Sequence, residues 1–496
     1  MPPIATAPLP STTQISRSSS VIQVPPSATC PMSRRLSADG RAARPPLMSH
    51  AVQTMTTPKL RRPGYAPDND AVGRRGMRTR AAIVRRAADL FADQGFHNTS
   101  IDAIAKAAGA SRATVYQYFR SKDDILAELA DQCRPALIAH AERFGALAPD
   151  ERGLQSLRTW LSDLADLYDL YTVVFVVFPG VGMHQEVPAA SPDGGVGDAY
   201  LNAITAEVCR AGVTGLDAAD MAAAVLRVAH MVNLYRSRRM FGLGSSTATT
   251  ESLAIALLRL LFPAWQPAAT AASTRPRATA STIAAPPARP VIAPASSTTT
   301  VRLDVLAAAS ALFAEHGYHA VSMEDIALAA QVGRTTLYRH FSTKVAVLAE
   351  LTDWAVLEGG ELWTELHQLA VTGATPTGLR GWLSRYVHYH RSYGAVIRAW
   401  YDGTVAEQLP EDIVSQGLGG FHAAVHSLLA TAELPPGIDE DVAAAFFLAV
   451  LGRLSEMTVS RHPDFSDYDA AGLMYTVVQR ALLSADPAFA EPPVKS

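Results

Sequence analysis

The sequence contains little cysteine and no long apolar run. Its 496 residues include three cysteines, which lie far apart, without the spacing of a metal site or a disulfide framework. No stretch approaches the roughly 20 apolar residues of a membrane span, and the first residues lack the basic segment and apolar core of a secretory signal. We therefore expect a cytoplasmic, nucleoid-associated protein that makes no contact with a membrane.

Motifs for catalysis are absent as well. The sequence has no glycine-rich phosphate loop, no nucleophile elbow and no cluster of metal ligands. Two histidine pairs, His388/His390 and His422/His426, lack a nearby carboxylate or cysteine that would complete a metal set. We predict a protein that is not an enzyme and has neither cofactor nor metal. An enzyme fused to a DNA-binding anchor is the alternative from another class.

Charge is distributed unevenly along the chain. Residues 1–86 contain fourteen Arg and Lys against three acids, although the whole chain has a net charge of −3. A basic arm on an acidic body suits a protein that touches phosphate. Residues 1–73 are rich in Ser and Pro and are predicted to be a disordered basic tail, residues 264–300 a flexible linker, and residues 487–496 a second tail.

The rest of the chain consists of two copies of one unit. A shift of 222 positions places residues 80–132 over residues 302–354 without a gap, and 22 of these 53 positions are identical. This internal repeat predicts two equivalent domain pairs. The first pair is a helix-turn-helix domain at 74–132 and a helical regulatory domain at 133–263. The second is a helix-turn-helix domain at 301–354 and a regulatory domain at 355–486.

Apolar periodicity predicts an all-α fold. Ile83, Ala87, Leu90 and Phe91 recur at helical spacing, and the second copy repeats the pattern. Gly95 and Gly317 are expected to end this first helix. Serines predict the next helix starts, since Ser, Thr, Asp and Asn favour the N-cap position: Ser100, Ser111, Ser121 and Ser322. Later helices are expected at about 153–170, 199–211, 217–241 and 249–262, then at 377–400, 411–432, 439–461 and 467–484.

Three short helices with a glycine-bearing turn predict a helix-turn-helix whose last helix lies in the DNA major groove. Val115 and Phe119 point to the core, so Ala113 and Gln117 project away from it. No acid occurs between residues 112 and 122 or between 334 and 344. Hydroxyl groups and phenols on this face can reach phosphates, while Arg and Gln read base edges.

These residues resemble the recognition segment of the tetracycline-repressor (TetR) family. The resemblance covers about 50 residues of each copy and includes residues 111–122, residues 333–344 and the Leu-Phe-Ala-x-x-Gly-[Phe/Tyr]-His pattern of the first helix. It implies a sequence-specific transcriptional regulator, a dimeric repressor released from a double-stranded DNA operator by a small-molecule effector of unknown identity. The helical remainder of each half fits the family's ligand-binding and dimerisation domain by length and helicity.

The resemblance also implies roles for single residues. The base-facing residues are Arg112, Ala113 and Gln117 in copy one, and Arg334, Thr335 and Arg339 in copy two. The phosphate-contacting residues are Thr114, Tyr116, Tyr118 and Lys122, and Thr336, Tyr338, His340 and Lys344. The capping serines Ser100, Ser111 and Ser322 complete the predicted DNA-binding set.

Copy two departs from the pattern at two positions. Gln331 replaces the turn glycine Gly109, although the turn favours a positive φ, and Gly333 replaces the capping Ser111. Copy two is also less basic, with four Arg and Lys against six acids over residues 302–354. An alternative is therefore that only the first copy binds DNA, while the second serves dimerisation or sensing.

Two further features leave alternatives open. The basic segment 74–80 fits either an arm in the minor groove or a solvated cluster. Aromatic and Met side chains are predicted to line effector pockets, although ordinary core packing fits them equally: Phe175, Phe178, Met231, Tyr235, Tyr386, Tyr389 and Trp400.

The duplication predicts that the two halves pair as two subunits would. We expect an intramolecular pseudo-dimer, formed by the last two helices of each half at about 217–262 and 439–484. The linker of about 37 residues would span roughly 30–37 Å, which matches half-sites one helical turn apart. A homodimer that pairs copy to copy is equally permitted by this linker.

Overall fold

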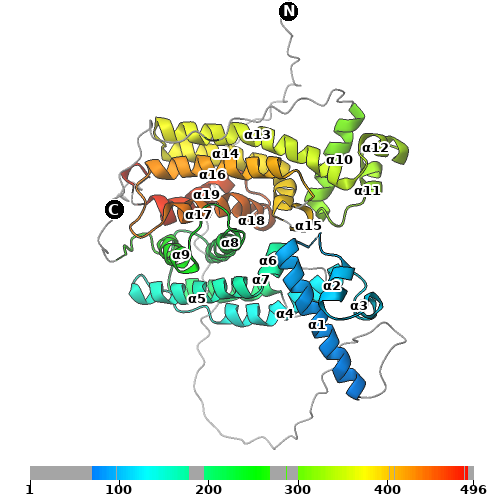
Figure 1. Ribbon diagram of the computed structural model, residues 1–496. Coiled ribbons are helices and arrows are strands. Elements are labelled where there is room, and N and C mark those ends of the chain that lie inside the picture. Colours follow the sequence, from blue (N-terminus) through cyan, green and yellow to red (C-terminus); the bar gives the residue numbers. More distant parts are fainter. Residues whose placement is uncertain are drawn as a thin grey trace, which may run out of the picture. The chain divides into compact units, whose positions relative to one another are not determined.

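The computed structural model describes residues 70–96, 98–177, 195–267, 286, 300–401, 403–406, 408–484 and 486–489. Every regular element within these ranges is a helix, which confirms the all-α prediction (Figure 1). Within the same ranges no helix is long and apolar enough to cross a membrane. The predicted N-terminal tail and the linker lie almost entirely outside the described residues.

The described residues of the first half form nine helices. They are α1 (Asp70–Gln94), α2 (Ile101–Ala107), α3 (Arg112–Tyr118), α4 (Lys122–Glu142), α5 (Glu151–Leu170), α6 (Thr172–Val177), α7 (Val196–Arg210), α8 (Ala218–Ser237) and α9 (Ser246–Leu261). The segment 74–80, predicted as an arm or a solvated cluster, is part of α1. Helix α4 runs through the predicted domain boundary at residues 132–133 without a break.

The second half repeats this order. Its helices are α10 (Thr300–His316), α11 (Met323–Ala329), α12 (Arg334–His340), α13 (Lys344–Thr372), α14 (Pro376–Trp400), α15 (Gly403–Ala406), α16 (Glu411–Thr431), α17 (Glu440–Ala449), α18 (Ser455–Arg461) and α19 (Asp467–Val478). Two π-helical turns, η1 (Val450–Leu454) and η2 (Gln479–Leu483), continue α17 and α19, and a 3-10 turn, η3 (Pro487–Phe489), follows. Helix α13 crosses the predicted boundary at residues 354–355.

Local chemistry sets the helix ends where the sequence predicts them. Gly95 and Gly317 follow α1 and α10 with φ of 81° and 79°, a conformation that glycine adopts without steric cost. The Oγ atoms of Ser100, Ser111 and Ser121 accept hydrogen bonds from backbone N–H groups of the helices that they precede. These bonds satisfy donors that an uncapped helix would leave without a partner.

In the core of the second half, aromatic side chains pack against glycines. In α13 and α16, a Cβ atom on Gly359 would lie 3.1 Å from the Tyr389 hydroxyl, and one on Gly420 would lie 2.6 Å from the Trp363 ring. Both rings are fully buried. The two helices therefore approach closely because glycine leaves room for large aromatic side chains between them.

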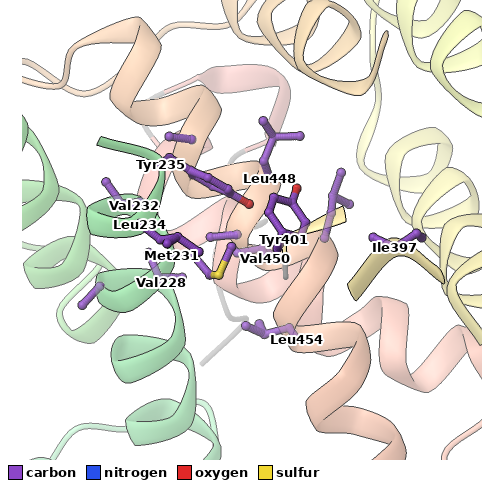
Figure 2. Packing of buried hydrophobic residues seen from close by; sticks show 14 of the residues in the cluster. Val228, Met231, Val232, Leu234, Tyr235, Ile397, Tyr401, Leu448, Val450 and Leu454 are labelled. Carbon is purple, nitrogen blue, oxygen red and sulfur yellow. The ribbon is translucent and has the colours of Figure 1, made fainter. Parts of the chain in front are cut away.

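The last two helices of the two halves pack against each other. Helices α8 and α9 contact α17, η1 and η2 (Figure 1). Figure 2 shows Val228, Met231 and Tyr235 of α8 beside Val450 and Leu454 of the second half. All of these side chains are buried. The segments expected to pair, 217–262 and 439–484, are therefore in contact within one chain.

Two neighbouring glycines of α16 give a test of this packing. Gly420→Ala should lower the free energy of unfolding by roughly 1–3 kcal/mol, because its methyl group would overlap the buried Trp363 ring. Gly419→Ala is the matched control, since nothing lies within 4 Å of its added Cβ. It should raise stability by about 0.5–1 kcal/mol through helix propensity. Urea unfolding followed by circular dichroism measures both, and equal effects would contradict this account of the core.

Candidate nucleic-acid interface

The first recognition helix is held by its buried side. Helix α3 begins after Ser111, whose Oγ accepts a hydrogen bond from the Thr114 N–H at 3.1 Å. Val115 and the following Phe119 are buried in the core that Ile104 also enters. Arg112, Ala113 and Gln117 are exposed on the opposite side. The faces predicted from the helical period are therefore the ones that the structure has.

The second recognition helix, α12, repeats this arrangement. Leu337 and Phe341 are buried, whereas Arg334, Thr335 and Arg339 are exposed. Gly333 occupies the cap position without a side-chain hydrogen bond. The turn before it keeps its shape without glycine, since Gln331 has a φ of 55° where Gly109 has 63°. Copy two thus carries a strained turn residue and a weaker cap but presents the same exposed face.

Each exposed arginine has an acidic neighbour from the preceding helix. Arg112 Nη1 lies 3.0 Å from Asp102 Oδ2, and Arg334 Nη1 lies 3.4 Å from Glu324 Oε1 at the equivalent position. A hydrogen bond with Tyr116 and the charge of Asp102 raise the pKa of Arg112, so it stays protonated. Ion pairs on an exposed surface contribute little to stability. Both guanidinium groups can therefore exchange these carboxylates for another hydrogen-bond acceptor at small cost.

The remaining predicted residues lie on or beside the same two helices. Hydroxyl, phenol and imidazole groups that are at least partly exposed flank the positions predicted to face bases, and Tyr338 is the most exposed of these rings: Thr114, Tyr116, Tyr118, Thr336, Tyr338 and His340. Ser100 and Ser322 instead use their hydroxyl groups to cap α2 and α11. Ser322 also forms a full capping box with Asp325.

The two predicted phosphate-contacting lysines make bonds within the domain. Lys122 Nζ donates to the carbonyl of Phe96 at 2.6 Å, and Lys344 Nζ donates to the carbonyls of Tyr318 and Val321, both at 2.7 Å. Each ammonium group also lies over the ring of Phe96 or Tyr318. Burial lowers the pKa of Lys344. In this structure the lysines therefore brace the loop between the first and second helices of each unit.

Sequence reasoning missed a second brace. Arg80 makes a two-pronged ion pair with Glu128, and its guanidinium carbon lies 5.0 Å from the Phe119 ring centre. Arg302 repeats the pair with Glu350. These contacts join the first and fourth helices over the aromatic residue that ends the recognition helix. A signal existed, because both members of each pair are identical in the two copies.

The predicted effector-lining residues do not gather in one place. Phe175 stacks on Tyr168 inside the first half at 3.8 Å between ring centres, whereas Met231 and Tyr235 lie where α8 meets the second half (Figure 2). Tyr386, Tyr389 and Trp400 are buried in the second half. Phe178 lies outside the described residues. Met231 and Tyr235, which were predicted to line an effector pocket, thus lie between the halves.

The fold and these exposed faces define an all-helical protein with two helix-turn-helix units. The tetR family of bacterial regulatory proteins matches the chain twice, over residues 83–129 and 305–351. These ranges contain both recognition helices and the helices that support them. Both helix-turn-helix units therefore match the tetR family, and the two matches indicate a tandem, TetR-like architecture.

Curated relatives are similar to the chain over short stretches. The fatty acid metabolism regulator protein of Bacillus subtilis is 40% identical over 47 residues, and the HTH-type transcriptional regulator AcrR of Shigella flexneri is 43% identical over 51 residues. Each match covers 10% of this chain and 24% of the relative. Across the curated relatives the matched stretch spans 20–30% of their length.

Solved structures resemble one half of the chain. The fatty acid degradation regulator FadR of Bacillus halodurans is 18% identical, with a TM-score of 0.30, over 37% of this chain and 96% of its own. NalD of Pseudomonas aeruginosa, described as the secondary repressor of the MexAB-OprM multidrug efflux pump, is 21% identical, with a TM-score of 0.29, over 37% of this chain and 95% of its own.

The lysine braces can be tested by removal. Lys122→Ala and Lys344→Ala should each lower the free energy of unfolding by about 1–3 kcal/mol, because partly buried carbonyl groups lose a charged donor. The exposed Lys106 supplies the control Lys106→Ala, which should change stability little. Urea unfolding measures all three variants. If Lys106→Ala is as harmful as the other two, the lysines do not act as braces.

Proposed function

We propose that this chain is a sequence-specific DNA-binding transcriptional regulator that acts as a repressor and is released by a small-molecule effector. The observation that carries the proposal is the acid-free exposed face on the last helix of each helix-turn-helix unit. In this reading Arg112, Gln117 and Arg339 contact base edges. Neighbouring hydroxyl and phenol groups contact phosphates.

One chain supplies both DNA-binding units in this proposal. The contact of α8 and α9 with α17, η1 and η2 supports it, because the two halves pair within one chain and each half carries one recognition helix. Two DNA-binding units that are related by a two-fold axis read two half-sites of one operator. A homodimer of two chains is the competing arrangement, and it would carry four recognition helices.

In the same proposal, the small-molecule effector binds to the helical regulatory domains. Tyr386 and Tyr389 have ring centres 5.8 Å apart, and the Trp400 Nε1 donates to Thr352 Oγ1 at 3.3 Å. These aromatic groups come from α14 and are buried. They suit a largely apolar molecule with few polar groups, the usual occupant of a protein pocket.

Arginine removal tests DNA binding by each copy. Arg112→Ala and Arg334→Ala should each weaken operator binding by about 1–3 kcal/mol and relax specificity in one half-site, because a base-reading donor is lost. Selection of bound fragments from random DNA supplies the operator, and gel retardation measures the affinity. If Arg334→Ala changes nothing while Arg112→Ala abolishes binding, only the first copy reads DNA. If purified protein retards no DNA, the proposed function is wrong.

The two recognition helices should prefer unlike half-sites. Gln117 suits adenine, whereas Arg339 at the equivalent position suits guanine through O6 and N7. We expect an imperfect palindrome as the preferred site, and Gln117→Arg should make that site more symmetric. Sequencing the DNA selected by the wild type and by the variant measures this. A perfectly symmetric site for the wild-type chain would contradict the prediction.

A further inference from the structure

The contact between the halves joins two equivalent positions that hold different residues. Met231 of α8 and Arg453 of η1 are 222 positions apart, which is the repeat distance. Arg453 Nε lies 3.1 Å from Met231 Sδ, and both side chains are buried. Residues that meet their own equivalents lie on the two-fold axis of a paired repeat. At this axis the first half offers a thioether and the second half a guanidinium group.

The charges near this axis come from opposite halves and complement each other. Arg453 Nη1 lies 2.9 Å from Glu456 in the second half. Burial lowers the pKa of Arg227 in the first half to about 10. The charge of Glu456 acts in the opposite direction on this pKa. The first-half equivalent of Glu456 is Leu234. A pair of first halves would therefore have no carboxylate at this position.

A second group of charges lies further along the same helices. Asp220 of α8, almost fully buried, is 3.0 Å from Arg461 Nε and 2.8 Å from His462 Nε2 of the second half. The second-half equivalent of Asp220 is Val442. Two second halves would thus lose this acceptor on both sides, and they would bring two Arg453 side chains into the space that one arginine and one methionine now share.

We propose that these residues make the pairing heterotypic, so that the last helices of the first half fit those of the second half better than either fits a second copy of itself. Arg453 and the missing equivalent of Asp220 act against self-pairing of the second half, and in a pair of first halves Asp220 would meet Met240 in place of His462. An uncompensated buried charge is strongly destabilising, so each mismatch opposes a like pair. The inference concerns an interface and does not depend on the proposed DNA binding.

Exchange of residues across the axis tests the proposal on the full-length chain. Met231→Arg makes both sides arginine and should lower the unfolding midpoint by roughly 5 °C or more. The radius or the mass measured by light scattering should rise with it, because separated halves extend or pair with another chain. Arg453→Met makes both sides apolar but also removes the cation that pairs with Glu456, so it serves as the parent of the double variant. The double variant M231R/R453M should recover at least half of the M231R loss, since it again places unlike residues opposite each other.

Met231→Leu is the matched control and should leave both the midpoint and the mass unchanged. The proposal is overturned if the double variant is no better than M231R, because burial of an arginine at position 231 would then explain the loss. None of these measurements uses DNA, so failure of the proposed function would leave their outcome unaffected.

A gentler change keeps the test valid if M231R does not fold. Asp220→Asn preserves size but removes the carboxylate that contacts the second half. We expect an increased fraction of two-chain species, seen as co-purification of tagged and untagged full-length chains. Asp163→Asn is the control, since Asp163 pairs with Arg143 within the first half. Equal co-purification in the two variants would overturn the proposal.

Discussion

The rest of the structure depends on one constraint, which is the burial of the last two helices of each half against the other half. Helix α8 and the C-terminal part of α9 are almost entirely buried, including polar residues such as Arg227, Asn233 and Arg259. A helix that is apolar or buried on every side needs neighbours all round. Within one half these helices have too few neighbours, so the fold of each half depends on its contact with the other half.

The duplicated halves have diverged differently in their two regions. The helix-turn-helix units keep the same braces, Arg80 with Glu128 and Arg302 with Glu350, because the position of a recognition helix tolerates little change. The paired helices have changed at the positions where the halves meet, as at Met231 and Arg453. A repeat within one chain allows this divergence, since each side of the interface can change independently of the other. A homodimer interface has no such freedom.

Much of the fold could be predicted from the sequence because it rests on local signals. Glycine at Gly95 and Gly317, serine caps and the helical period determine the helix-turn-helix units within a few residues. The arrangement of side chains across the chain could not be predicted in this way. Lys122 matches a phosphate-contacting position by pattern, yet its ammonium group donates to a carbonyl 26 residues away. Met231 and Tyr235 have the composition of pocket residues, and only the packing of the halves shows that they lie between them.

Asymmetry between the halves also bears on how an effector signal would reach DNA. The short helix α6 contacts α1 of the first helix-turn-helix unit, α8 of the paired helices and α15 of the second half. In the second half, α14 runs as one continuous helix through the positions equivalent to α6, and α10 packs directly on it. In the proposed function, a movement of the first helical regulatory part would reach its helix-turn-helix unit through a short separate helix, whereas the second unit is attached to a long continuous one. Conformational coupling requires an element with two discrete arrangements, and a separate six-residue helix satisfies that requirement better than the interior of a 25-residue helix.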